Sequence, residues 1–103
     1  MVSFLETLSW KTRRKIEAWI ALLEKEGPNL KRPYADKVVR ELYELRIRFG
    51  ADQIRILYFF FLREKIVLLH GFRKKQSAIE TGHISIAKSR MADVMRRYYE
   101  GRI

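Results

Sequence analysis

Residues 42–75 read LYELRIRFGADQIRILYFFFLREKIVLLHGFRKK and contain three segments of β-strand character that carry cations among hydrophobic residues. In the first segment the hydrophobic residues fall at odd positions: Tyr43, Leu45, Ile47 and Phe49. The charged residues take the even positions: Glu44, Arg46 and Arg48. Successive side chains of a strand point to opposite faces, so we expect the odd positions to face a core and the even positions to present cations. Nucleic acid is therefore the first partner to consider.

The two later segments extend this sheet. Residues 50–53 read as a turn, and the next strand, Ile54–Leu62, is so apolar that we expect both of its faces to be covered over part of its length. This makes it a central strand. Arg63 and Glu64 are predicted to form a tight hairpin turn, and the third strand runs from Lys65 to about Phe72. The prediction is a three-stranded antiparallel meander.

Helical patterns flank the sheet. Hydrophobic residues fall on one side of a helix over Trp10–Glu26, with Ser9 as its N-cap and Gly27-Pro28 as its stop. A smaller apolar cluster around Phe4 predicts a short preceding helix. Residues 29–36 are predicted to be a loop, and residues 37–41 fit neither a strand nor a loop clearly. A final helix is expected from His83 to Tyr99, which gives a single α+β domain over residues 1–103.

Composition narrows the function. The 103 residues carry 22 Lys and Arg against 12 Asp and Glu, a formal net charge of +10 that favours polyanionic partners. There is no cysteine, which excludes disulfides, thiolate metal sites and a cysteine nucleophile. No apolar run is long enough to span a bilayer, and the first residues lack the pattern of a signal peptide. We expect a cytoplasmic protein with no membrane partner, metal or cofactor.

Three strings taken in order resemble the RelE/ParE superfamily of type II toxins, and most of all its phage-derived, HigB-type branch. They are LYELR from Leu42, RILYFF from Arg55 and IVLLHGFRKK from Ile66. The resemblance implies a RelE-like fold, with N-terminal helices packed on a small antiparallel sheet and a C-terminal helix. Members usually begin with a strand ahead of the first helix, and this sequence shows none. Either the start site is displaced or the sheet lacks an edge strand, and an open edge could be covered by a partner or a second copy.

The resemblance also implies an activity, namely metal-independent, ribosome-dependent cleavage of mRNA that inhibits translation. The implied partners are mRNA, the ribosome and a cognate antitoxin of helix-turn-helix type. The catalytic residues implied by position are Arg46, Arg55, Lys74 and His83, and the neighbouring RNA-binding residues are Arg48, Arg73 and Lys75. After Lys75, residues 76–83 depart from the family pattern, because a cation is missing and an acidic residue, Glu80, is present.

Two other functions fit the same sequence. A ParE-like poison would block DNA gyrase through protein contacts without a catalytic cluster, and a decayed homologue would keep antitoxin binding alone. Structural readings also stand beside the catalytic ones. Arg46 could pair with Glu44 or with an acid on a neighbouring strand, whereas Arg55 lies in so apolar a strand that it needs a purpose or a buried partner. His83 could be a surface residue, Arg48 and residues 73–75 could be solvated, and the aromatic residues 58–61 are expected to pack in the core.

Overall fold

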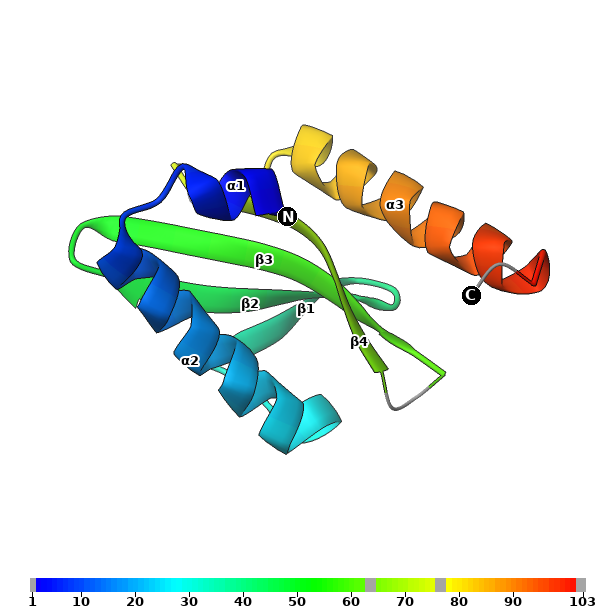
Figure 1. Ribbon diagram of the computed structural model, residues 1–103, viewed down its shortest axis with the longest axis horizontal. Helices are drawn as coiled ribbons and strands as arrows, with labels where there is room; N and C mark the ends of the chain where they lie inside the picture. The colour runs from blue at the N-terminus through cyan, green and yellow to red at the C-terminus, as the bar shows by residue number, and fades with distance from the viewer. Residues whose placement is uncertain (1, 63–64, 76–77, 102–103) are drawn as a thin grey trace.

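The computed structural model describes residues 2–62, 65–75 and 78–101, which form an α+β fold (Figure 1). In chain order the elements are α1 (Val2–Glu6), α2 (Trp10–Glu26), the 3-10 helix η1 (Gly27–Asn29), β1 (Ala35–Val39), β2 (Leu42–Phe49), β3 (Asp52–Phe61), β4 (Lys65–Arg73) and α3 (Thr81–Tyr99). The predicted order of helices, antiparallel sheet and C-terminal helix is confirmed. The turn predicted at Arg63 and Glu64 lies outside the described residues. Within the described residues no helix is both long and apolar enough to cross a bilayer.

The sheet has four strands, so the prediction of three was wrong. The strands lie in the order β1-β2-β3-β4 and every neighbouring pair is antiparallel. The additional strand is β1 (Ala35–Val39). Its first two residues were predicted to belong to a loop, and no prediction was made for the other three. It has five residues, of which only Ala35 is buried, so its sequence carries too short a hydrophobic alternation to identify it. Ala35 pairs with Leu45, and β1 thereby forms the edge of the sheet beside β2.

The bounds of α2 follow from local chemistry. The Ser9 hydroxyl accepts a hydrogen bond from the Thr12 N–H at 3.3 Å, which satisfies one of the free donors of the first turn. Gly27 ends the helix at a φ of 54°, in the left-handed region that favours glycine, and its N–H donates to the Leu23 carbonyl. Both predicted signals are confirmed. Trp10, expected on the apolar side of this helix, is instead 59% exposed.

Helices α2 and α3 cover opposite faces of the sheet, here called the α2 face and the α3 face (Figure 1). The buried strand residues of the α2 face are Ala35, Leu45, Ile47, Ile54, Ile56 and Tyr58. Those of the α3 face are Leu42, Leu57, Phe59, Phe61, Leu69 and Phe72. Strand β3 supplies both sets, which confirms that it is central. The face expected to be cationic is thus cationic only where α3 does not cover it.

A β-bulge changes the alternation within β4. Leu57 pairs with His70 while Tyr58 pairs with Leu68, so Leu69 is an extra residue on the β4 side. Before the bulge, Leu68 packs with the core of the α2 face. After it, Phe72 packs with the core of the α3 face although its position is also even. The bulge therefore decides which face each later side chain of β4 occupies.

Candidate functional site

The strand register gathers four cations at one end of the α3 face, beside the turn that joins β2 to β3. Arg46 lies directly opposite Arg55, and Arg48 lies opposite Gln53. Lys74 continues the line of β4, since its N–H donates to the Gln53 carbonyl at 2.7 Å. Alternation from Phe72 puts the Lys74 side chain on the same face. These four residues, Arg46, Arg48, Arg55 and Lys74, are called the cationic cluster below.

A buried carboxylate holds the centre of the cationic cluster. Glu44 is only 4% exposed, and its Oε1 accepts a hydrogen bond from Arg46 Nε at 2.5 Å. The same oxygen lies 3.6 Å from Arg55 Nε. Asp36 on β1 adds a second carboxylate, 3.2 Å from Arg46 Nη2. The predicted pairing of Arg46 with Glu44 or a neighbouring acid is therefore found with both acids at once.

Arg55 is the most deeply buried cation of the cationic cluster, at 8% exposure. Burial lowers its pKa and the nearby Glu44 carboxylate opposes that shift, but an arginine keeps its charge at any physiological pH. Its Nη1 donates to the Ile54 carbonyl at 3.4 Å, and its buried Nε makes no hydrogen bond within the described chain. Glu44 supplies the buried partner that the sequence argument required of Arg55.

His83, in the first turn of α3, packs against a strand neighbour of the cationic cluster. Its ring stacks on Phe72 with ring centroids 3.8 Å apart and an interplanar angle of 6°. Phe72 is the strand partner of Arg55, so the Phe72 ring links His83 to the cationic cluster. His83 Nδ1 lies 2.9 Å from His70 Nε2, an interaction that the sequence did not predict. That bond occupies one ring nitrogen of His83 and leaves Nε2 as the nitrogen able to meet a ligand.

His70 is half-buried, and its Nε2 contacts His83. Burial lowers the pKa of His70, and the neighbouring His83 and Arg90 lower it further. His70 is therefore neutral near pH 7, and a neutral imidazole can donate from one nitrogen and accept at the other. Beside this pair Arg90 donates to the Leu69 carbonyl at 2.7 Å and ties α3 to the bulge of β4.

The other predicted binding residues lie apart from the cationic cluster. Arg73 pairs with Ile54, whose side chain is in the core of the α2 face, so the Arg73 side chain points to the opposite side from Lys74. Lys75 is exposed beyond the end of β4. Of the aromatic residues 58–61, Tyr58, Phe59 and Phe61 are buried, as the core interpretation predicts.

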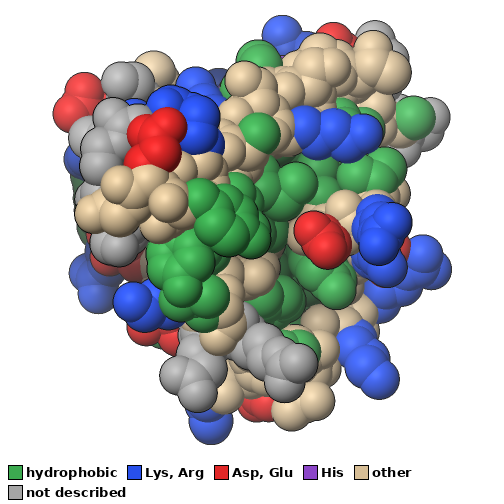
Figure 2. Space-filling model, turned by 90° about the vertical axis from the view of Figure 1, so that its right-hand side faces the viewer, with side chains coloured by type: hydrophobic (Ala, Val, Ile, Leu, Met, Phe, Trp, Pro, Cys, Tyr) green, Lys and Arg blue, Asp and Glu red, His purple; other side chains and the backbone are tan. Residues whose placement is uncertain are grey.

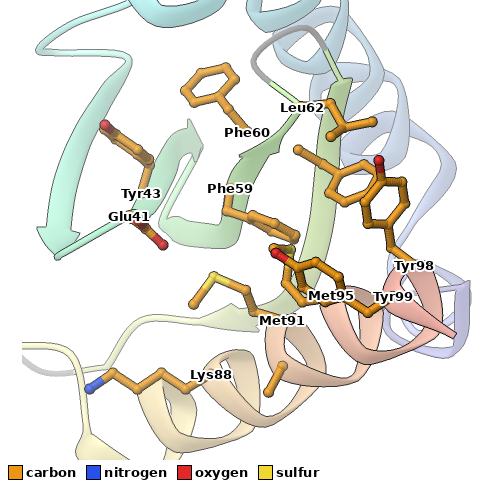
Figure 3. A pocket seen from close by; sticks show the side chains of 12 residues that line it. Glu41, Tyr43, Phe59, Phe60, Leu62, Lys88, Met91, Met95, Tyr98 and Tyr99 are labelled. Carbon is orange, nitrogen blue, oxygen red and sulfur yellow. The ribbon is translucent and has the colours of Figure 1, made fainter.

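A separate apolar groove lies on the α3 face, between α3 and the distal halves of the strands, with a volume of about 410 Å³. Figure 2 shows this side of the molecule, where hydrophobic side chains surround a hollow. Phe59, Met91 and Met95 point into the groove, with Tyr98 and Leu62 at one end of it (Figure 3). No member of the cationic cluster is among the described residues that line it.

The comparison with protein families shows to which family the chain belongs. Residues 3–92 match the family described as phage derived protein Gp49-like. The chain belongs to the Gp49-like family. That family is part of the RelE/ParE-like toxin superfamily, so the resemblance to the superfamily is confirmed. Gp49-like membership suggests a toxin–antitoxin toxin of the RelE type and specifies no activity. No curated protein matches the Gp49-like chain.

Sequence reasoning named Glu44 as a possible partner of Arg46 and missed the contact of His70 with His83. Glu44 carries a signal, since an acid two positions before Arg46 in a strand must lie on the same face. His70 carries none, because only the bulge at Leu69 turns it toward His83. The described residues contain no group of three His, Cys, Asp or Glu side chains arranged to hold a metal ion.

Proposed function

We propose that the Gp49-like chain is the toxin of a type II toxin–antitoxin system, of the HigB-like branch and with a RelE-like fold. Its activity is metal-independent cleavage of mRNA on the ribosome. The observation that carries the proposal is the cationic cluster with His83 beside it, on a part of the sheet that α3 leaves uncovered.

The chemistry requires three roles. A base takes the proton of a ribose 2′-hydroxyl, cations neutralise the charge that develops on the attacked phosphate, and an acid protonates the departing 5′-oxygen. Arg46 and Arg55 suit the second role because guanidinium groups stay charged and bind phosphate oxygens in pairs. Lys74 adds a point charge from the neighbouring strand. His83 serves proton transfer through Nε2, while His70 holds its Nδ1.

The partners follow from charge. A chain with a net charge of +10 is attracted to mRNA and ribosomal RNA at long range. The same charge favours an antitoxin whose acidic segment covers the cationic cluster and so prevents RNA from reaching it.

The test compares two adjacent cations on opposite faces. Wild type, Lys74→Ala and Arg73→Ala are expressed from an inducible promoter, and growth and transcript 5′ ends are recorded. Both substitutions remove one positive charge, but only Lys74 belongs to the cationic cluster. We expect wild type and Arg73→Ala to arrest growth and cut transcripts in phase with codons, and Lys74→Ala to cut about a hundredfold less, the usual loss for one transition-state contact.

The other outcomes separate the alternative functions. Growth arrest without transcript cleavage would assign a protein target such as gyrase. A folded wild-type protein that causes no growth arrest would favour the decayed homologue that keeps antitoxin binding alone. Equal losses in Lys74→Ala and Arg73→Ala would show that net charge, and not the cationic cluster, carries the effect.

A further inference from the structure

A pocket of about 380 Å³ opens at the edge of the sheet where β1 stops covering β2. The last backbone contact at this edge is the Arg46 N–H, which donates to the Tyr34 carbonyl at 2.7 Å. Beyond it, Arg48 of β2 lines the pocket from one side and α2 lines it from the other. The pocket is thus lined by α2, residues 33–34, β2 and β3, and it shares Arg46, Arg48 and Arg55 with the cationic cluster.

The described lining of this pocket is cationic and aromatic. Its charged side chains are all positive: Lys15, Arg46, Arg48 and Arg55. Its aromatic side chains are Trp19 and Tyr34, whose ring centroids are 5.9 Å apart. Lys15 Nζ lies 4.4 Å from the centroid of the Trp19 ring, so the indole is already engaged by a cation. Tyr34, at 40% exposure, is the ring that remains open to a ligand.

Two residues that line the pocket carry buried donors that make no hydrogen bond within the described chain: Trp19 through Nε1 and Arg55 through Nε. A buried N–H without an acceptor costs stability, and Arg55 is more than nine-tenths buried. The ion pair of Arg55 with Glu44, at 3.6 Å, is longer than a hydrogen bond and does not satisfy its Nε–H. Unsatisfied donors in a cationic, aromatic pocket suit a ligand with a flat ring, several acceptors and negative charge.

We infer that this pocket binds one nucleotide of single-stranded RNA, with the base stacked on Tyr34 and the phosphate against Arg48. The inference rests on the proposed function, because it places a nucleotide of the substrate beside the cleavage site. Stacking on a tyrosine ring accepts any base, so the pocket holds the strand in place without reading its sequence.

The experiment separates the contribution of the base from that of the phosphates. Purified protein is titrated into two fluorescein-labelled hexaribonucleotides, hexaadenylate and the same backbone with abasic riboses, and anisotropy gives both affinities. Wild type is expected to bind hexaadenylate about tenfold more tightly, as one stacked base allows. Tyr34→Ala should remove that preference and keep the abasic affinity, whereas Tyr34→Phe should retain the preference. Tyr99→Ala is the matched control, because Tyr99 is 78% exposed at the far end of α3.

Each remaining outcome has one meaning. Equal affinities of wild type for both RNAs would overturn the proposal that this pocket binds a base, and would not affect the proposed nuclease activity. A preference that depends on Tyr34, in a protein that neither arrests growth nor cuts transcripts, would support the pocket and overturn the nuclease alone. Displacement of hexaadenylate by polyglutamate in wild type but not in Tyr34→Ala would overturn the RNA assignment in favour of an acidic protein segment.

Discussion

Glu44 lies buried between the guanidinium groups of Arg46 and Arg55, and its charge is what allows two like charges to face each other across neighbouring strands. Opposed like charges destabilise a strand pair. Here one carboxylate offsets part of that repulsion, while Asp36 compensates the outer arginine from β1. The site therefore combines a concentration of positive charge with internal acids that keep it folded.

Replacing Glu44 with glutamine tests this balance. Glu44→Gln leaves Arg55 buried without its countercharge, so we expect the free energy of unfolding to fall by roughly 3 kcal/mol, as for other broken buried ion pairs. Urea unfolding followed by circular dichroism measures the change. Glu24→Gln, at an exposed position of α2, is the control and should stay within about 0.5 kcal/mol of wild type. A Glu44→Gln protein as stable as that control would show that Glu44 does not support the arginines.

At the scale of elements, the long strands and helices could be predicted and the short edge strand could not. Alternation predicts β2, a continuous apolar sequence predicts β3, and capping residues predict the ends of α2. Strand β1 is held by its pairing with β2, and little in its own five residues marks it. The bulge in β4 depends on how Leu69 fits against β3, which no local pattern records. Alternation predicted that Arg46 and Arg48 share a face, and the family resemblance implied Arg55 and Lys74. The side of the sheet that Lys74 takes depends on the bulge, as does the His70–His83 contact.

The docking of α3 on β4 should depend on pH through His70. Burial lowers the pKa of His70 in the folded state, so below its ordinary value of about 6.5 the unfolded chain binds more protons than the folded one. This contribution to stability is present above about pH 6.5 and is lost as the pH falls through the lowered value. His70→Gln keeps a donor for His83 and removes the titration, so it should lose less stability than wild type between about pH 7.5 and pH 5. Urea unfolding at both pH values measures this, and parallel losses in the two proteins would contradict it.

At the scale of the whole molecule, the sheet separates two hydrophobic cores that share the central strand β3. Adjacent residues of β3 serve different cores: Ile56 packs on the α2 face and Leu57 on the α3 face, and both are fully buried. Since β3 belongs to both cores, we expect the chain to unfold as one unit. Ile56→Ala and Leu57→Ala should each lower the free energy of unfolding by about 2–5 kcal/mol.

That prediction is checked by following two probes in one denaturant titration. Far-ultraviolet circular dichroism reports the helices and tryptophan fluorescence reports the side of α2, and the two curves should coincide for both variants. Two separated transitions in Leu57→Ala, with the tryptophan signal changing last, would mean that the α2 core survives without the α3 core.

The bulge at Leu69 determines whether the odd-numbered or the even-numbered residues after it lie on the α3 face. Every residue of β4 after Leu69 owes its side of the sheet to one added amino acid, because the pleat inverts with each single step along the strand. Deleting that amino acid would turn the side chains of His70, Phe72 and Lys74 to the opposite face of the sheet. The side chain of Arg73 would then lie on the α3 face. The composition would hardly change, yet the aromatic ring, the imidazole and the lysine would all be lost from the site in one step. The number of residues in β4 therefore determines which side chains lie at the candidate site, as much as their chemical types do.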